Sequence, residues 1–481
     1  MSVEAVRQFD LNIEKVLEHW TPAYALRELI ANAFDEHMLT KTAVPEIYKD
    51  EQGAWHIRDY GRGLRYEHFT QNENKEKLKH PEMVIGKFGV GLKDAMATFD
   101  RKKIHILIRS RHADITMDKS HKHGFEDIVT LHAVIQPPSD LNLVGTDVIL
   151  YGVRDEDMEQ AKDFFLQFSG DEILESTTYG SVLKPKKKKK ARIYVNGLCI
   201  AEEDNFLFSY NITSLNAVLR KALNRERTNV GRSAYTDRVK SILLACSHSA
   251  VAIEMSADLK NYETGYIHDE LQWTDVQLHA CKILNANEKV LFLTPDQMRN
   301  GGSLVTHAQD DGYRLVVVPE SIADRLTNVQ DIQGKPIRDL DGYREEFNTS
   351  FQFTYVPISS LSKQEKKVFA VKELILNWLP NSQTKNIKEI CISETMRVDY
   401  SGSEALGLWE PLEQRITIKR SQLRNVVDFA GTLLHEITHA FTGADDESME
   451  FEKGLTQMLG QLTSYAIKNE LPKGFLGLFK S

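Results

Sequence analysis

Two histidines and a glutamate near the carboxyl terminus have the types and spacing needed for hydrolysis. They are His435, Glu436 and His439, within the sequence HEITH. On a helix, residues four apart lie one turn apart on the same face, so both imidazoles can bind one zinc ion while Glu436 stands beside its water. A five-residue pattern also arises by chance, and a helical histidine is usually an ordinary core or surface residue. The surrounding sequence therefore has to support the interpretation.

A catalytic zinc ion needs a third protein ligand and an open position for water. The acidic residues that follow His439 offer candidates, namely Asp445, Asp446, Glu447, Glu450 and Glu452. The apolar spacing beyond them predicts a helix on which Glu452 shares a face with Leu455 and Leu459. A carboxylate on a buried face is unfavourable unless it is paired or binds a metal. Glu452 is therefore the predicted third ligand, and Asp445 is the alternative.

Two strand-like segments, KEICISE and RITIKR, precede this helix, as strands do in zincins. The pattern resembles the gluzincin plan, in which a glutamate on a second helix completes the site. Asp445 instead occupies the offset of the third ligand in metzincins, although Thr442 stands where those proteins have glycine. The resemblance implies that Glu436 takes a proton from water and passes it to the leaving amine. A degenerate zincin that keeps the fold without cleavage is the other interpretation.

Length and composition indicate a chain with several domains and an ordinary globular composition. At 481 residues the chain exceeds one typical hydrophobic core, so two to four domains are expected. No apolar run approaches the roughly 20 residues of a membrane-spanning helix, and the amino terminus lacks a secretion signal. We therefore expect a cytoplasmic protein without membrane contact. The four cysteines are too far apart in sequence for a disulfide framework or a cysteine-ligated zinc.

The charge distribution gives one local candidate for contact with nucleic acid. A net charge of -9 provides no global reason to expect it. The run Lys186–Lys190 is the exception. Consecutive lysines repel one another and usually form a solvated loop, so an anionic partner is the secondary interpretation.

A second group of residues, near the amino terminus, has the pattern of a nucleotide site. Thr21 and Pro22 predict a capped helix start. On that helix Glu28, Asn32 and Asp35 fall on one polar stripe. Such a stripe is normally only a solvated face, but two glycine-rich segments follow it here.

The first glycine-rich segment, residues 55–63, predicts a strand that runs into a tight turn, where Asp59 can accept a hydrogen bond from a ligand amine. The second, residues 86–95, places three glycines before a helical pattern. The free backbone N–H groups and the dipole at that helix start can hold phosphates. Further along, Thr146 offers a hydroxyl at the start of the strand GTDVIL.

The order and spacing of these four segments closely resemble the Bergerat-type ATP-binding domain of the GHKL superfamily. That superfamily joins DNA gyrase B subunits, heat-shock chaperones, MutL-type repair proteins, MORC proteins and histidine kinases. The resemblance implies a sandwich of an antiparallel sheet and helices, with ATP between them under a mobile lid, here residues 70–85. GKFGVG and GTDVIL look most like the chaperone and MORC branches.

The same resemblance assigns roles to individual residues. It implies that Asn32 holds Mg²⁺, that Asp59 and Thr146 bind the adenine, and that Glu28 activates the water for ATP hydrolysis. The glycines would shape the pocket, with Gly61 and Gly63 around the adenine and Gly86, Gly89 and Gly91 around the phosphates.

The sequence thus predicts an α+β multidomain protein in three parts. Residues 1–183 form a GHKL ATP-binding domain with a Bergerat α/β sandwich, 184–345 an α/β transducer-like middle region, and 346–481 a zincin-like metallopeptidase domain. The predicted function is an ATP-controlled zinc metallopeptidase with ATP, Mg²⁺ and Zn²⁺ as cofactors. A protein substrate, an ATP-dependent homodimer, and a microbial stress or anti-phage role accompany this prediction. The alternative is a chaperone-like or MORC-like clamp that remodels protein or DNA, with a structural or degenerate zinc site.

Overall fold

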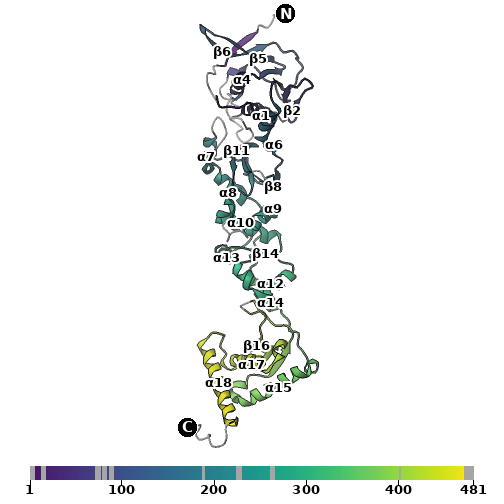
Figure 1. The fold of residues 1–481 in the computed structure, drawn as a ribbon, viewed down its shortest axis with the longest axis vertical. Coiled ribbons are helices and arrows are strands. Elements are labelled where there is room, and N and C mark those ends of the chain that lie inside the picture. The colour runs from purple at the N-terminus through teal and green to yellow at the C-terminus, as the bar shows by residue number, and fades with distance from the viewer. Residues whose placement is uncertain are drawn as a thin grey trace. The chain divides into compact units, whose positions relative to one another are not determined.

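The chain contains both helices and several β-sheets. This agrees with the general form of the predicted α+β multidomain class. The computed structural model describes residues 6–11, 18–70, 77, 84–85, 91–186, 190–223, 230–259, 266–399 and 402–470. The chain divides into two compact units, Met1–Asn287 and Glu288–Ser481 (Figure 1). This division falls within the predicted middle region 184–345, and the three predicted domains stay a prediction. The two units are described separately below.

The first unit contains a seven-stranded sheet in the order β1-β6-β5-β4-β7-β3-β2, with all neighbours antiparallel. Alternate residues along its strands, such as Ile106 and Ile108, are buried against helices on one face. The strands are β1 (Arg7–Asp10), β2 (Glu46–Lys49), β3 (Trp55–Arg58), β4 (His105–Ser110), β5 (Ala113–Lys122), β6 (Phe125–Gln136) and β7 (Thr146–Tyr151). The helices are α1 (Pro22–Thr40), α2 (Glu67–Thr70), α4 (Gly91–Lys102), α5 (Asp155–Asp163) and α6 (Leu166–Ser169).

Helix α1 begins where the sequence predicts, with Thr21 at the N-cap and Pro22 in the first turn. The Thr21 side chain makes no capping hydrogen bond, so that detail of the prediction is wrong. The helix ends at Lys41, whose left-handed conformation (φ 54°) lets its N–H reach the carbonyl of His37. Most of α1 is buried, including the polar residues Glu28 and Asp35.

A five-stranded sheet in the order β11-β10-β12-β9-β8 completes the first unit. The sequence ARIYVNGLCI at residues 191–200 predicts a strand, a turn and a second strand. The structure confirms this hairpin, with Asn196 and Gly197 both at positive φ as a tight turn requires. Its strands are β8 (Glu172–Ser176), β9 (Gly180–Lys184), β10 (Ala191–Val195), β11 (Leu198–Glu203) and β12 (Ser209–Ile212). The accompanying helices are α7 (Ala217–Ala222), α8 (Thr236–Leu244), α9 (Ser249–Leu259) and α10 (Thr274–Asn287).

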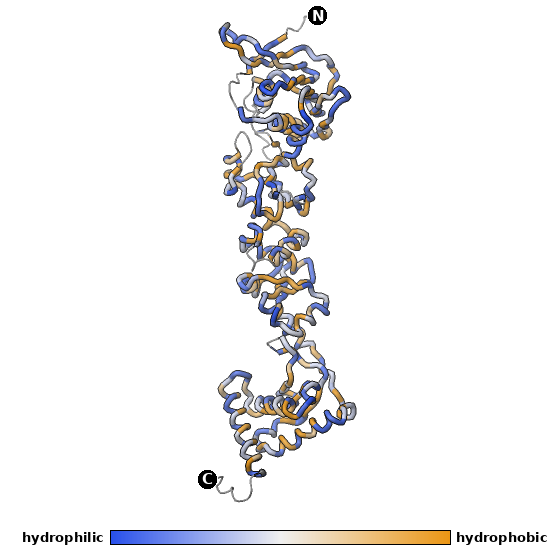
Figure 2. Tube along the Cα trace, viewed as in Figure 1, coloured by the Kyte–Doolittle hydropathy of each residue, from blue (hydrophilic) through white to orange (hydrophobic). Residues whose placement is uncertain are grey.

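Hydrophobic and hydrophilic residues are interleaved along the trace (Figure 2). Among the described residues, no single helix is long and apolar enough to cross a membrane. Helices α8 and α9 reach that length and composition only as a pair, and they are bent by 113° at the break between them.

The second unit begins with two parallel strands and the helices around them. Residues 289–325 contain two short apolar segments, each followed by a helical pattern, which predicts two strand–helix pairs. The structure confirms both pairs. These elements are β13 (Val290–Leu293), α11 (Pro295–Asn300), α12 (Gly302–Asp310), β14 (Arg314–Val317), α13 (Glu320–Leu326) and α14 (Leu340–Ser350).

The remainder of the second unit packs helices against a three-stranded sheet of order β15-β17-β16. Strand β15 is parallel to β17, whereas the edge strand β16 is antiparallel to it. The elements are α15 (Lys363–Trp378), α16 (Asn381–Thr384), β15 (Glu389–Ser393), β16 (Gly407–Glu410), β17 (Arg415–Lys419), α17 (Val426–Thr442) and α18 (Met449–Glu470). The core joins Ile416 and Ile418 of β17 to Phe429 and Leu433 of α17. This packing fixes α17, which carries the HEITH sequence, against the sheet.

Candidate functional sites

Helix α17 holds the histidine pair in a well-defined frame. The Asn425 side chain caps the helix by accepting the backbone N–H of Asp428, and Gly443 ends it in the left-handed conformation (φ 66°). The helical spacing of four apolar residues predicts a buried stripe, and the structure confirms it: Phe429, Leu433, Ile437 and Ala440 are all buried. The remaining face presents His435 and His439 toward the turn that follows the helix.

The two imidazoles and one carboxylate converge at one point. Nε2 of His435 lies 3.2 Å from Nε2 of His439, and Oδ1 of Asp446 lies 3.0 Å and 3.3 Å from these two atoms. All three donor atoms lie within 4.8 Å of one another. His439 donates its Nδ1–H to the carbonyl of Ala444 at 2.8 Å, which leaves a lone pair on Nε2. Two imidazole nitrogens and a carboxylate oxygen form a donor set that suits zinc.

The predicted third ligand, Glu452, is not in this group, and its predicted burial is wrong. Glu452 is exposed. Met449 (62%) and Leu459 (52%) are exposed as well, although they stand three residues before and seven after Glu452, where apolar side chains suggest a buried face. Helix α18 instead buries Phe451 and Met458. The physical reason is the contact of Phe451 with both imidazoles, which turns the next residue along the helix away from the site.

Two features of this contact were missed from the sequence. The Phe451 ring lies 4.8 Å from the His435 ring and 4.5 Å from the His439 ring, so it limits the orientations of both. Gly454 permits the close approach of α18, because a Cβ there would lie 2.6 Å from Cγ2 of Thr442. A conspicuous glycine inside a predicted helix often has such a packing role, so Gly454 was the residue from which this close approach could have been predicted. The rival Asp445 also lies outside the convergent group.

Glu436 is buried beside the histidine pair, only 6% exposed, and faces strand β16. A Cβ on Gly407 of β16 would lie 2.6 Å from Oε1 of Glu436, so the strand and the carboxylate are in direct contact. Burial, and then the charge of Asp446, raises the pKa of Glu436 to about 8, against a smaller opposing effect of the Trp409 backbone N–H. Burial lowers the pKa of His435, with Asp446 opposing the shift. A carboxylate with raised basicity therefore stands next to the three donors.

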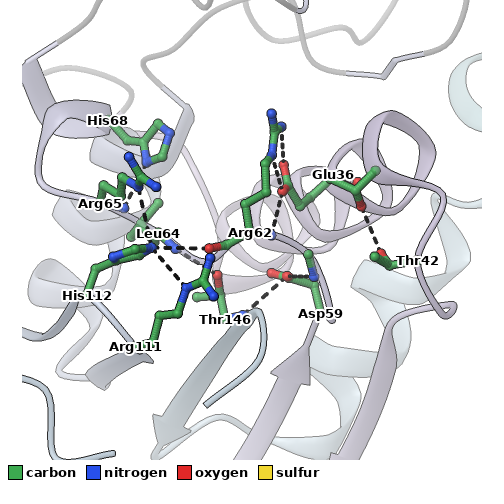
Figure 3. A network of polar contacts seen from close by, with 12 residues as sticks. Glu36, Thr42, Asp59, Arg62, Leu64, Arg65, His68, Arg111, His112 and Thr146 are labelled. Atoms are coloured by element: carbon green, nitrogen blue, oxygen red, sulfur yellow. Dashed lines mark hydrogen bonds and ion pairs between the residues drawn. The ribbon is translucent and has the colours of Figure 1, made fainter. Parts of the chain in front are cut away.

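The first unit contains a cavity of about 150 Å³ between α1 and the seven-stranded sheet. Part of its rim is shown in Figure 3. Among the nucleotide-site residues expected from the sequence, the cavity brings together Asn32, Asp59, Gly63 and Thr146. The other polar lining residues are Glu36, His68 and Lys77, and the apolar lining includes Leu29, Ala33, Ile57, Leu64, Leu92, Ile108 and Val148. A cavity of this size admits a single aromatic ring system.

Asp59 and Thr146 are hydrogen-bonded to each other in the wall of this cavity. Oδ1 of Asp59 accepts the backbone N–H groups of Gly61 (2.9 Å) and Thr146 (3.2 Å), and the Asp59 N–H returns a bond to the Thr146 carbonyl. The Thr146 hydroxyl oxygen accepts the N–H of Leu64 at 3.2 Å, so its own O–H hydrogen can point elsewhere. Burial, with help from the charge of Glu36, raises the pKa of Asp59 against the hydrogen bond from Gly61.

Glycine is required at this turn for steric reasons. Gly145 has φ 77°, and a Cβ there would lie 2.1 Å from the Asp59 carbonyl oxygen. A Cβ on Gly61 would lie 2.2 Å from Cγ of Glu36. Glu36 accepts three hydrogen bonds from Arg62, each at 2.9 Å, and sequence reasoning did not single out this pair. Burial alone would raise the pKa of Glu36, but the Arg62 contacts lower it.

Asn32 has a cationic partner. The Lys77 ammonium donates to Oδ1 of Asn32 at 3.1 Å and to Oδ2 of Asp35 at 2.6 Å. A positive charge therefore lies where the sequence placed Mg²⁺. Most of the expected lid over residues 70–85 lies outside the described residues, as do Gly86 and Gly89.

Glu28, on α1, lies against the first residue of α4, Gly91, and is not among the cavity-lining residues. A Cβ on Gly91 would lie 2.5 Å from its Oε2, and Nη2 of Arg27 donates to its Oε1 at 2.8 Å. Arg27 is fully buried and packs against three aromatic rings, those of Trp20, Tyr24 and Phe164. The sequence analysis did not single out Arg27, because the sequence shows its charge but not its burial among aromatic rings.

The lysine run has acidic partners at both described ends. The backbone N–H of Lys186 donates to Oδ1 of Asp171, and the Lys190 ammonium lies 2.8 Å from Oδ1 of Asp204. Residues 187–189 lie outside the described residues, so contact with nucleic acid stays a prediction.

The fold and the sites together define a mixed α/β multidomain protein with a histidine–carboxylate cluster and a separate polar cavity. An uncharacterized protein of Mycoplasma pneumoniae is 38% identical over 243 residues, which is 50% of this chain and 97% of that protein. The chain belongs to the same protein family as this Mycoplasma protein. Residues 156–249 match the family model described as the Mycoplasma pneumoniae MPN635 N-terminal domain.

Two further uncharacterized proteins of the same organism are more distant. One is 22% identical over 345 residues, covering 67% of this chain and 96% of that protein. The other is 27% identical over 178 residues, covering 36% of this chain and 92% of that protein. None of these descriptions assigns an activity.

Proposed function

We propose that this protein is a zinc-dependent peptide hydrolase under the control of ATP. The observation that carries the proposal is the convergence of His435, His439 and Asp446 within 4.8 Å, with the buried Glu436 beside them. The packing of α17 against the three-stranded sheet supports a zincin-like assignment for this domain. Asp446 takes the place that the sequence gave to Glu452.

The edge strand β16 offers a place for the substrate. An exposed strand edge can pair with an extended peptide through backbone hydrogen bonds. Because Gly407 of β16 touches Glu436, a peptide paired with this strand would carry its backbone past the histidine cluster. Substrate selection would then rest mainly on an extended backbone conformation.

The chemistry follows from the groups at the site. A zinc ion held by the three donors would act as a Lewis acid that polarises the peptide carbonyl and acidifies water. The Glu436 carboxylate takes one proton from the attacking water as its oxygen bonds to the carbonyl carbon. Glu436 then gives that proton to the amide nitrogen as the C–N bond breaks, which releases a carboxylic acid and an amine. The raised pKa of Glu436 keeps the proton available for this second transfer.

The nucleotide half of the proposal rests on the cavity at Asp59. Its carboxylate can accept from the amino group of an adenine ring, and the Thr146 hydroxyl can serve the same ring edge. The antiparallel seven-stranded sheet with helices on one face supports a GHKL-like assignment. The phosphates would extend toward Gly91 at the start of α4, where Glu28 can activate water. Asn32 would hold Mg²⁺ by its amide oxygen only after the Lys77 ammonium, which binds that oxygen in this structure, moves away.

The test uses the purified full chain with a library of quenched fluorescent peptides. Wild type should contain zinc, cleave a subset of peptides and hydrolyse ATP. His435→Ala should lose zinc and cleavage, Glu436→Gln should lose cleavage while keeping zinc, and Glu28→Ala should lose only ATP hydrolysis. Equal peptide cleavage with and without ATP, in wild type and in Asp59→Asn, would remove the coupling. Biological activity that survives Glu436→Gln would favour the clamp with a structural zinc. The ATP-dependent homodimer and the microbial stress or anti-phage role are further proposals, which this assay does not test.

A further inference from the structure

Three basic residues from two segments gather at the rim of the N-terminal cavity, beside its lining residues Gly63 and His68. They are Arg65, two residues after Gly63, and Arg111 and His112 in the turn between β4 and β5 (Figure 3). A Cβ on Gly63 would lie 3.4 Å from Cδ2 of His112, so the turn directly touches the cavity wall. The backbone N–H of Arg65 donates to Nδ1 of His68 at 2.9 Å. The group is therefore held close to the cavity by backbone contacts.

The contacts within this group are incompatible with one another. Nε of Arg65 and Nε of Arg111 both point at Nε2 of His112, each at 3.4 Å. The same Nε2 lies 3.3 Å from the Arg62 carbonyl oxygen, which can only accept a hydrogen bond. One ring nitrogen cannot donate to the carbonyl and also accept from two guanidinium groups. When His112 donates to Arg62, both arginines lack an acceptor at this position.

The carboxylates of Glu36 and Glu67, on the segments around this group, have other partners. The nearby carboxylate of Glu36 is already engaged by Arg62. In the part of the chain that the structure describes, Arg65 and Arg111 have no carboxylate partner. Two guanidinium groups that both lie 3.4 Å from one ring nitrogen repel each other, and a bound oxyanion would turn this repulsion into attraction. Guanidinium forks bind the oxygens of phosphate groups with matching geometry.

We propose that Arg65, Arg111 and His112 form a binding site for a phosphate ester at the rim of the cavity. This goes beyond the proposed function, which places the ATP phosphates near Gly91. Each guanidinium group would donate a hydrogen bond to a phosphate oxygen, while Nε2 of His112 keeps its hydrogen bond to the Arg62 carbonyl oxygen. The phosphate comes either from a second position on a nucleotide whose base fills the cavity, or from a nucleic-acid strand that passes the rim.

The test measures binding of four probes to the full chain: inorganic pyrophosphate, ATP, adenosine 3′,5′-bisphosphate and a short single-stranded oligonucleotide. The variants are Arg65→Gln, Arg111→Gln and the double variant. Arg109→Gln is the matched control, because Arg109 is exposed on β4, lies outside the group and loses the same charge. Each single variant should weaken pyrophosphate binding by about tenfold, and the double variant by more. Arg109→Gln should stay within about twofold, and circular dichroism should be unchanged in all variants.

The other probes identify the source of the phosphate. Loss of affinity for the bisphosphate, with ATP unaffected, assigns the site to a second phosphate on the nucleotide. Loss for the oligonucleotide, with a salt dependence reduced by about one unit per arginine, assigns it to a nucleic-acid strand. The proposal is overturned if the double variant binds every probe as Arg109→Gln does. If wild type binds pyrophosphate through Arg65 and Arg111 but does not bind ATP, the phosphate site stands and the proposed ATP function fails.

Discussion

Oδ1 of Asp446 lies 3.0 Å from Nε2 of His435 and 3.3 Å from Nε2 of His439. Helix α17 ends at Gly443 in the left-handed conformation, and Glu447 also has positive φ (62°), so the turn between them folds back over the helix end. This turn returns the Asp446 carboxylate to the histidine pair. The third donor therefore comes from the turn rather than from the helix that follows it.

Removal of the Asp446 charge should lower zinc affinity with little effect on folding. We expect Asp446→Asn to weaken zinc binding by at least about tenfold, because an amide is a poorer ligand than a carboxylate. Glu452→Gln and Asp445→Asn are the matched controls and should bind zinc as wild type does. Competition with a chromophoric chelator measures the affinity. An equal loss in Glu452→Gln would restore the ligand predicted from the sequence.

Two glycines near the site should respond to alanine in opposite directions. Gly407→Ala places a methyl group 2.6 Å from Oε1 of Glu436, so β16 or the Glu436 side chain must shift, at a cost of about 1–3 kcal/mol in the free energy of unfolding. Peptide cleavage should fall with this shift. Gly431 on α17 has open space around its Cβ position, and Gly431→Ala should stabilise the helix by about 0.5–1 kcal/mol.

Urea titration of both alanine variants, followed by a probe in the second unit, measures these changes. Zinc content should be unchanged in Gly431→Ala, which makes it the control for the general effect of an added methyl group. A Gly407→Ala variant that is as stable and as active as wild type would show that β16 does not constrain Glu436.

Replacement of the Asp59 carboxylate by an amide should remove the charged acceptor proposed for the adenine amino group. We expect Asp59→Asn to weaken ATP binding by at least about tenfold, because a buried ligand amine would lose its charged acceptor. Asp118→Asn, at an exposed position on β5, controls for the change in net charge. Fluorescence anisotropy with a labelled ATP analogue measures the affinity. Equal binding by both variants would place the nucleotide elsewhere.

The Glu365–Arg420 pair should make stability depend on pH in the acid range. The hydrogen bond from Arg420, and then that from the Ser362 N–H, lowers the pKa of Glu365 from an ordinary value of 4.5 to about 2. A depressed carboxylate pKa contributes stability that is present above the unfolded pKa and is lost as pH falls through the folded pKa. The contribution should therefore be full above pH 4.5 and absent near pH 2.

Glu365→Gln isolates this charge, because glutamine can still make the capping bond to the Ser362 N–H at the start of α15. The melting temperature of wild type should exceed that of the variant at pH 6, and the difference should shrink steadily below pH 4.5. A difference that is constant across this range would mean that the charge of Glu365 is not what stabilises the pair.

The parts of the fold that the sequence predicted are those that depend on local periodicity. The start of α1 at Pro22, the hairpin at Asn196 and the buried stripe of α17 all follow from residues close together in the chain. The helical spacing of His435 and His439, with Glu436 between them, is set in the same way.

The helix predicted beyond the acidic residues is confirmed as α18, but the face of it that was predicted to be buried is wrong. Met449 and Leu459 are exposed, while Phe451 is drawn inward by its contact with the two imidazoles. Local periodicity has no information about that partner. The exposed acidic residues on either side of Phe451 could not be ranked without it.

Residue spacing is enough to predict that two imidazoles and a carboxylate share one helix, and that glycines lie near Asp59. The folded structure is needed to show that Asp446 completes the histidine cluster, that Gly407 lies against Glu436, and that Arg65 and Arg111 meet at His112. The reason is physical, because these contacts join segments whose separation is set by turn conformation and by long-range packing. Residue types and spacing define the available chemistry, whereas packing selects which of the available groups face one another.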